Sequence, residues 1–198
     1  ADEVSAMAGI DRFTIHPRKG EYYIFDKLLN GFVQQILFPV PTPISKGTVV
    51  TPTVDGNILI GPNAQNVEDK NDSATTSRGL DEVFSGALKL IPELAEKKSM
   101  IITNFCGLRP EPDTNDFIVE SYDEVRGFIN AAGMRSPGLT AAPAVAQTVT
   151  DLLRKSGLEL REKDSFNALR KPIDRSVRRF DMESAKWLIA RDPTWGHV

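Results

Sequence analysis

Short apolar segments with the two-residue alternation typical of β-strands follow one another along most of the chain, and turn residues separate them. The clearest turn signal is Asp55-Gly56, which predicts a β-hairpin within residues 48–62. Strands and helices do not alternate regularly, so the pattern predicts an α+β fold rather than a doubly wound parallel sheet. The other strand-like segments lie at residues 12–16, 21–27, 32–40, 99–110, 115–122 and 127–133.

Two long segments have the period of an amphipathic helix. The first spans about residues 80–91, where Thr76 or Ser77 can cap its start and Pro92 ends or kinks it. The second runs from about Thr140 to Ser156. Shorter helices are expected at residues 2–9 and 182–190, whereas residues 39–47 and 63–77 are predicted to be loops.

Composition excludes several classes of protein. The 198 residues include 40% hydrophobic and 26% charged side chains with a net charge of −3, as in an ordinary globular protein with no overall attraction for nucleic acid. No apolar run approaches the ~20 residues that span a bilayer. Cys106 is the single cysteine, which excludes a disulfide framework and a cysteine-rich metal site and favours a reducing cytoplasm. His16 and His197 form no motif, and a Gly-rich phosphate loop is absent.

Arg109 is the first candidate for a binding residue. It follows an apolar strand and stands in a Gly-Leu-Arg-Pro sequence that is predicted to turn. A guanidinium held on a stiff turn can bind a carboxylate or phosphate through two hydrogen bonds. The alternative is a structural arginine paired with Glu111, Asp113 or Asp116, and the residues alone leave both open.

A second candidate lies in PRKGEYY, residues 17–23, where Arg18 and Lys19 precede Tyr22 and Tyr23. Strand alternation places the two tyrosines on opposite faces, so at most one serves a pocket. A solvated basic turn is the alternative. The basic segment 170–180 similarly predicts either a nucleic-acid patch or, because aspartates accompany it, a solvated surface.

The third candidate is the loop that enters the second long helix. A helix that begins near Thr140 leaves unpaired backbone N–H groups and a partial positive charge at its start. Gly138 lets a ligand approach the backbone closely, and Pro137 stiffens the loop. The loop is therefore suited to an anion or the polar edge of a ring. A plain strand-to-helix turn is the alternative.

Four segments make the chain similar to a known family. PRKGEYYIFDK, LFPVPTPISKGTVVTPTVDGNILIGPNA, NFCGLRPEPDTNDFIVE and GFINAAGMRSPGLTAAPAVAQTV occur in this order. Together they resemble, over roughly residues 1–155, the branch of the D-amino-acid-oxidase-like flavoenzymes that contains FAD-dependent glycerol-3-phosphate dehydrogenases and L-2-hydroxyglutarate oxidases. In such enzymes a Rossmann-type domain binds FAD, and a second domain covers the flavin and holds the substrate.

The resemblance implies an arrangement of domains. Residues 1–127 would be the substrate, or cap, domain, an antiparallel or mixed sheet with flanking helices. Residues 128–156 would be a strand–loop–helix segment that returns to the FAD domain, and residues 157–198 a C-terminal extension or linker. From the resemblance we expect the N-terminal FAD-binding half to be missing, and the chain to be an internal fragment that is inactive alone; whether it holds FAD stays open.

The resemblance also implies roles for particular residues. Arg109 would bind the anionic group of the substrate, and Arg18 and Tyr22 would lie in the substrate site. The start of the second long helix would point at the pyrimidine end of the isoalloxazine ring and stabilise negative charge on the reduced flavin. The residues expected to bind the cofactor are Gly133, Met134, Arg135, Ser136, Pro137, Gly138, Leu139 and Thr140.

The implied activity is that of an FAD-dependent dehydrogenase or oxidase. It would oxidise a small anionic substrate, glycerol 3-phosphate or a 2-hydroxy acid, by hydride transfer to FAD, and an electron-acceptor partner would reoxidise the flavin. No nucleic acid and no membrane-spanning segment are expected, although the parent protein's association with a membrane stays open. No catalytic base is assigned. The alternative is a non-catalytic module that binds a ligand or protein on the same scaffold.

Overall fold

The computed structural model describes residues 1–41, 47–169 and 181–193. The chain divides into two units, residues 1–159 and 160–198, which are described separately. The first unit contains a five-stranded antiparallel sheet, a two-stranded antiparallel sheet and the helices that pack on them. This arrangement confirms the predicted α+β fold with flanking helices.

The larger sheet is built around one long central strand, β1 (Ile15–Phe25). One edge of β1 pairs along its whole length with β5 (Ile101–Pro112). Its other edge pairs with β3 and β4, and β2 completes the order β2-β3-β1-β4. These three short strands are β2 (Val49–Pro52), β3 (Ile58–Gly61) and β4 (Gln65–Asn66), of which β2 and β3 form the hairpin predicted around Asp55-Gly56.

Two predictions about the long strands are wrong. Residues 12–16 and 21–27 do not form separate strands, because β1 passes without interruption through Pro17. The Gly-Leu-Arg-Pro sequence is not a turn either, since it lies inside β5. Pro17 and Pro110 lie directly opposite each other. In an antiparallel pair every second pair of opposed residues exchanges no hydrogen bonds, so two prolines fit there without breaking the ladder.

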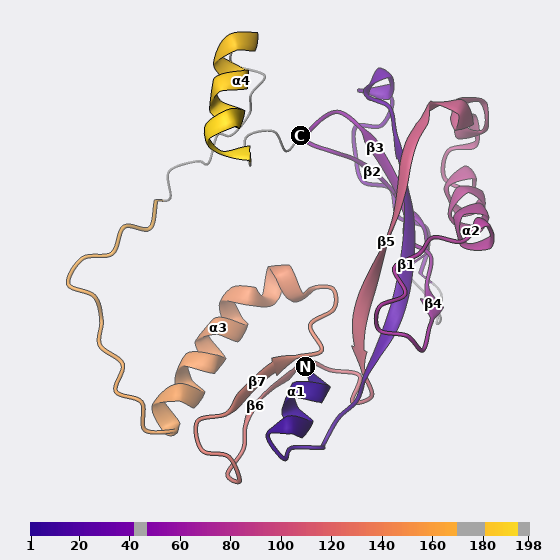
Figure 1. Ribbon diagram of the computed structural model, residues 1–198. Coiled ribbons are helices and arrows are strands. Elements are labelled where there is room, and N and C mark those ends of the chain that lie inside the picture. The colour runs from indigo at the N-terminus through magenta and orange to yellow at the C-terminus, as the bar shows by residue number, and fades with distance from the viewer. Residues whose placement is uncertain (42–46, 170–180, 194–198) are drawn as a thin grey trace. The chain divides into compact units, whose positions relative to one another are not determined.

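The main core lies on one face of the larger sheet, under helix α2 (Ser77–Leu88) (Figure 1). Thr76 caps this helix, as predicted, by accepting a hydrogen bond from the N–H of Gly79 at 3.0 Å. After Pro92 the chain continues as the 3-10 helix η2 (Pro92–Met100), and a shorter one, η1 (Lys27–Leu29), follows β1. The buried core side chains are Phe25, Leu29, Val33, Val50, Ile58, Ile60, Val83, Phe84, Ala87 and Leu94.

The predicted strand at residues 32–40 is also wrong. This segment contributes only one isolated bridge, between Leu37 and Val50. Its apolar side chains do alternate in burial, with Val33 buried and Leu37 packed on the core, whereas Phe32, Ile36, Phe38 and Val40 are exposed. Residues 63–77 form a largely irregular segment, as predicted, although β4 lies within it.

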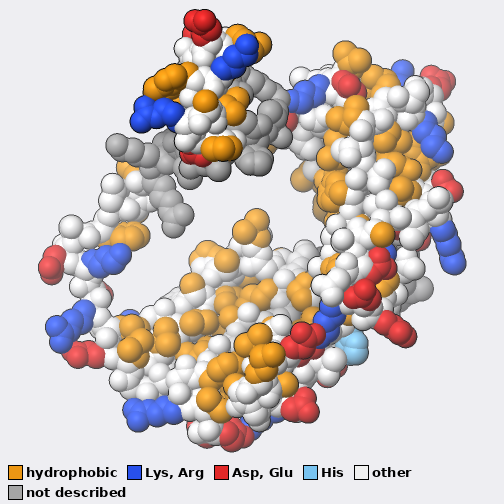
Figure 2. Space-filling view, viewed as in Figure 1, with side chains coloured by type: hydrophobic (Ala, Val, Ile, Leu, Met, Phe, Trp, Pro, Cys, Tyr) orange, Lys and Arg blue, Asp and Glu red, His pale blue; other side chains and the backbone are white. Residues whose placement is uncertain are grey.

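The smaller sheet pairs β6 (Ile118–Ser121) with β7 (Ile129–Ala132). Helix α3 (Gly138–Lys155) packs on both strands and begins two residues before the predicted Thr140. Helix α1 (Asp2–Met7) joins this group, because the side-chain amide of Asn130 in β7 donates to the Ser5 hydroxyl at 2.6 Å. No residue of α3 is fully buried, and Figure 2 shows hydrophobic side chains gathered over α3 and its neighbouring strands.

The second unit contains helix α4 (Met182–Arg191), close to the predicted 182–190. The carboxylate of Asp181 caps it by accepting from the N–H groups of Glu183 and Ser184. The basic segment 170–180 and His197 lie outside the described residues. Within the part of the chain that the structure describes, every helix is too short or too polar to cross a bilayer.

Candidate functional site

The candidate site lies on the face of the larger sheet that is opposite α2. Residues opposed in an antiparallel pair point to the same side, and successive residues alternate sides. Arg18 is opposed to Arg109, Gly20 to Gly107 and Tyr22 to Phe105, so all six share one side of β1 and β5. We call this side, defined by these three pairs, the open face. Lys19, Glu21, Tyr23 and Phe25 point to the other side.

Arg109 crosses strand β1 on the open face. Its Nη2 atom donates a 2.8 Å hydrogen bond to the backbone carbonyl of Asn63, which lies beyond the opposite edge of β1. The guanidinium passes over Gly20, where a Cβ would overlap Nη2 and would lie 3.1 Å from Cζ. Gly20 stands between Arg18 and Tyr22 on the same face. The fold therefore brings together the three residues expected to bind substrate.

The carboxylates considered as structural partners of Arg109 are bound elsewhere. Glu111 pairs with Arg135 at 3.0 Å, Asp113 accepts from the N–H of Thr14 at 3.0 Å, and Asp116 accepts from the N–H of Phe117 at 2.7 Å. Among the described residues, Arg109 forms no ion pair. One edge of its guanidinium bonds a neutral carbonyl, so it can still bind an anion through its other N–H groups.

Aromatic rings border the arginines. The ring of Tyr22 stacks on that of Phe105, with ring centroids 4.8 Å apart and an angle of 7° between their planes. The Tyr22 ring also lies over Gly61, where a Cβ would be 2.5 Å from Cδ1 of the ring. Tyr23 points away and packs against the main core, as strand alternation predicts. Burial is the largest of the effects that raise the pKa of the Tyr23 hydroxyl.

Lys19 does not share the site with Arg18. Its ammonium group is buried on the side of the sheet away from the open face, where Nζ bonds the carboxylate of Asp72 at 2.7 Å and the carbonyl of Ala74 at 2.8 Å. This contact attaches the irregular segment after β4 to β1. The prediction of a solvated basic turn at residues 17–20 is therefore wrong, because β1 passes through it and its two basic residues point to opposite sides.

His16 and Cys106 supply no evident nucleophile or base. His16 is exposed near the start of β1, opposed to Glu111. Cys106 is half-buried, and burial is the main effect that raises the pKa of its thiol. A neutral thiol is a poor nucleophile. Within the described ranges, no group of three or more His, Cys, Asp or Glu residues could hold a metal ion.

The loop expected to bind cofactor connects β7 to α3. Gly133 has a φ of 66° and is buried against Pro112, where a Cβ would lie 2.8 Å from Cγ of the proline. Arg135 bonds Glu111 and also donates to the carbonyl of Asn115 at 2.7 Å. These contacts hold the loop at the end of β5, the strand that carries Arg109.

The start of α3 is open to a ligand. Pro137 occupies the N-cap position and no side chain caps the helix. Ser136, Pro137, Leu139 and Thr140 are exposed, and Met134 and Gly138 are half-buried. Uncapped N–H groups at a helix start, together with the helix dipole, suit a negatively charged oxygen or a ring carbonyl. The arrangement fits the cofactor-binding role expected of residues 133–140.

Sequence reasoning missed several residues that shape this site. Gly20 provides the space for Arg109, and its residue type alone does not indicate that role. The roles of Phe105 and Asn63 depend on contacts between segments far apart in the sequence. No local sequence pattern predicts which residues of these segments lie opposite each other. The one available signal was the i, i+2 spacing of Arg18, Gly20 and Tyr22 within a strand.

Comparison with known proteins places the chain in a family. Residues 1–152 match the family model described as FAD dependent oxidoreductase, DAO. The chain is 37% identical over 198 residues to a glycerol 3-phosphate dehydrogenase of Caloramator mitchellensis, covering all of this chain and 41% of that protein. It is 35% identical over 169 residues to a glycerol 3-phosphate oxidase of Mycoplasma genitalium, covering 84% of this chain and 43% of that protein.

A solved structure gives the same assignment. The dithionite-reduced L-alpha-glycerophosphate oxidase of Mycoplasma pneumoniae with FAD bound superimposes with a TM-score of 0.73 at 32% identity, over 84% of this chain and 42% of that one. The chain thus spans about two fifths of the length of these relatives. By its sequence match and by its fold, it belongs to the DAO family of FAD-dependent oxidoreductases.

Proposed function

We propose that the protein containing this chain oxidises glycerol 3-phosphate, and that this chain supplies the wall of the substrate site. The observation that carries the proposal is the convergence of Arg18, Tyr22 and Arg109 on the open face, without a carboxylate bound to Arg109 among the described residues. Two relatives, called glycerol 3-phosphate dehydrogenase and glycerol 3-phosphate oxidase, are 37% and 35% identical and support this substrate.

In this proposal Arg109 binds the phosphate. Its guanidinium is fixed over Gly20 and directed by the carbonyl of Asn63, which leaves its remaining N–H groups for phosphate oxygens. Arg18, opposed to Arg109 in the strand pair, adds a second positive charge on the same face. The stacked Tyr22 and Phe105 rings provide an apolar border that strengthens these charge interactions by excluding water.

Residues 133–140 would hold the cofactor by its ring edge. FAD bound there would supply the hydride acceptor, and oxidation of the substrate hydroxyl to a carbonyl would also release the hydroxyl proton. The uncapped start of α3 would donate its free N–H groups to the ring, and Gly138 would permit the close approach. Arg135 would keep the loop in place through its ion pair with Glu111.

The domain arrangement is part of the proposal. The segment 128–156 would belong to the FAD domain. Its contacts with α1 and β6 support placing those two elements there too, which would shorten the substrate domain expected at residues 1–127. The exposed side of α3, which includes Ala142, Pro143, Ala144 and Ala146, would then pack within the same domain. The sheet from β1 to β5 would form the substrate domain.

Flavin reduction without oxygen tests the proposal. The protein would be expressed at the length of its relatives, loaded with FAD, and mixed separately with glycerol 3-phosphate, L-2-hydroxyglutarate and glycine. We expect glycerol 3-phosphate to bleach the flavin absorbance most efficiently. Bleaching by L-2-hydroxyglutarate alone would support an FAD-dependent oxidoreductase but contradict glycerol 3-phosphate as its substrate. Failure to bind FAD would contradict the enzyme and favour a binding module.

A further inference from the structure

We propose that Asn63 and Glu21 are positioning residues that direct Arg109 toward the substrate. The inference deepens the proposed function and rests on it, because it concerns the arginine that would bind the phosphate. Asn63 bonds Arg109 through its backbone carbonyl, at 2.8 Å. The direction of that carbonyl therefore determines where the guanidinium lies.

The Asn63 side chain is clamped by Glu21 on the buried side of the sheet. Its Oδ1 accepts from the N–H of Glu21 at 2.8 Å, and its Nδ2 donates to Oε2 of Glu21 at 2.7 Å. Asn63 is 4% exposed and Glu21 is fully buried. Two reciprocal hydrogen bonds in a buried site fix the orientation of the residue, and so of its peptide carbonyl.

Glu21 is itself fixed by helix α2. Its Oε1 accepts from the N–H and the hydroxyl of Thr76, the N-cap residue of the helix. A continuous chain of contacts thus runs from the start of α2 through Glu21 and Asn63 to Arg109. The side chain of Glu21 lies behind the sheet, and that of Asn63 is bonded to it there, so both would act only through the arginine.

The hydrogen-bond pattern allows a reciprocal exchange of donor and acceptor. Asn63→Asp places a second carboxylate beside Glu21, and Glu21→Gln places a second amide beside Asn63. Each single variant loses a bond and leaves unmatched buried groups. When both substitutions are combined, the new amide at position 21 can donate to the new carboxylate at position 63 and still accept from Thr76, so the original geometry is restored.

The test measures flavin reduction by glycerol 3-phosphate without oxygen in the full-length protein loaded with FAD. We expect each single variant to raise the half-saturating concentration about tenfold with little change in the limiting rate, and the double variant to return it to within about twofold of the wild type. In an Arg109→Ala background, Asn63→Asp should raise that concentration no further, because its effect passes through Arg109. Thermal melting of every variant separates this effect from loss of stability.

The outcomes distinguish the inference from the function on which it rests. If Arg109→Ala weakens binding but Asn63→Asp changes only the melting temperature, the positioning role is overturned and the proposed function stands. Additive effects of Asn63→Asp and Arg109→Ala would also overturn it. If Arg109→Ala leaves the half-saturating concentration unchanged, both the proposed role of Arg109 and the positioning role fail.

Discussion

At the scale of single residues, the short sequence from Arg18 to Tyr22 performs two tasks because β1 has two faces. Arg18, Gly20 and Tyr22 form the open face together with Arg109. Lys19 and Glu21 point to the other side, where they bond the segment 72–76 that leads into α2. Residue type alone could suggest Arg109, Arg18 and Tyr22. It could not suggest Gly20 or Asn63, whose roles depend on the strand register.

Gly20→Ala should be destabilising, whereas Gly107→Ala should not. The two glycines oppose each other in the same strand pair. A Cβ on Gly20 would overlap the Arg109 guanidinium and would lie 2.9 Å from Cβ of Pro62, whereas a Cβ on Gly107 would meet nothing within 4 Å beyond its chain neighbours. We expect Gly20→Ala to lower the free energy of unfolding by about 1–3 kcal/mol, and Gly107→Ala to change it by less than about 0.5 kcal/mol.

Denaturant unfolding of the two variants beside the wild type measures this difference. Equal stability of the two alanine variants would contradict the close packing of Arg109 and Pro62 over Gly20.

At the scale of elements, a buried carboxylate from strand β1 binds the start of helix α2. Glu21 accepts from Thr76 at the N-terminal end of the helix, where the helix dipole favours negative charge. Gly79 lies in the first turn, and a Cβ there would overlap the Glu21 carboxylate. The glycine in the first turn of the helix therefore leaves room for the Glu21 carboxylate, although glycine has a low helix propensity.

Gly79→Ala tests this contact against helix propensity. Propensity alone predicts that alanine stabilises a helix by about 1 kcal/mol relative to glycine. We expect the opposite, a loss of about 1–3 kcal/mol in the free energy of unfolding, because the Glu21 carboxylate must move. The exposed Ser85→Ala in the same helix is the control and should change stability by less than about 0.5 kcal/mol. Stabilisation by Gly79→Ala would contradict the contact.

The amphipathic period predicted α2 and α3 well, because their residues repeat locally every three to four positions. The strands were predicted less well for two reasons. Pro17 and Pro110 suggest breaks, yet they oppose each other at a position that needs no ladder hydrogen bond. The apolar segment 32–40 looks like a strand, yet within the described residues its only strand pairing is the bridge at Leu37.

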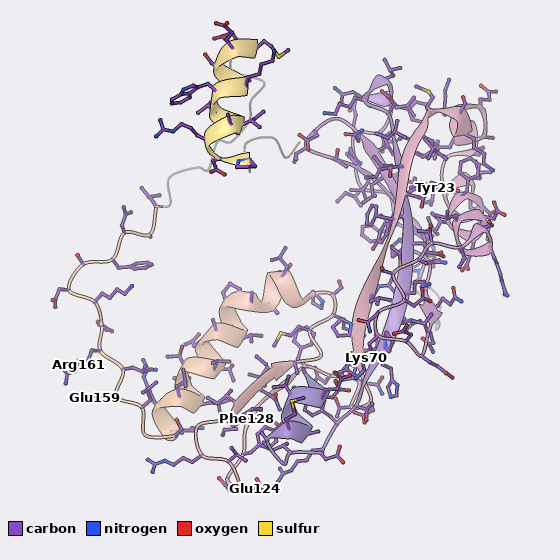
Figure 3. The ribbon with its side chains drawn as sticks, in the orientation of Figure 1. Tyr23, Lys70, Glu124, Phe128, Glu159 and Arg161 are labelled. Atoms are coloured by element: carbon purple, nitrogen blue, oxygen red, sulfur yellow. The ribbon has the colours of Figure 1, made fainter. Side chains whose placement is uncertain are left out.

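Helix α1 is attached to β1 by a carboxylate that makes stability depend on pH. Asp2 accepts from Lys70 Nζ at 2.6 Å and from the N–H of Ile15 at 2.9 Å (Figure 3, which labels Lys70). Burial raises the pKa of Asp2, but these hydrogen bonds outweigh it and lower the pKa from 3.8 to about 2. A lowered pKa adds stability above about pH 4, which is lost as the pH falls toward 2.

Asp2→Asn should therefore destabilise the protein by about 1–2 kcal/mol at pH 7. The difference from the wild type should vanish below about pH 2. Denaturant unfolding of the variant and the wild type, at neutral pH and at two lower pH values approaching the Asp2 pKa, measures this difference in stability. Glu3→Gln is the control, because Glu3 also bonds Lys70 but is 74% exposed. It should change stability by less than about 0.5 kcal/mol. A loss for Asp2→Asn that is the same at every pH would contradict the ionic origin.

At the scale of the whole molecule, we propose that one sheet face binds the substrate and that one helix start contacts the cofactor. The sheet from β1 to β5 has its core on the α2 side, and the open face lies on the other side. The ion pair between Arg135 and Glu111 connects the loop before α3 to the strand of Arg109. Family membership could be predicted from four sequence segments in order, whereas the course of Arg109 over β1 required the structure.

The most direct test asks whether Arg109 recognises the phosphate. Flavin reduction without oxygen would be measured for the wild type and Arg109→Ala, with glycerol 3-phosphate and with uncharged glycerol. Loss of a charged hydrogen-bonded contact should lower the second-order rate constant for glycerol 3-phosphate about 100-fold, and leave that for glycerol within about twofold. Equal losses for both substrates, or no loss for glycerol 3-phosphate, would contradict the proposal that Arg109 on the open face binds the substrate's phosphate.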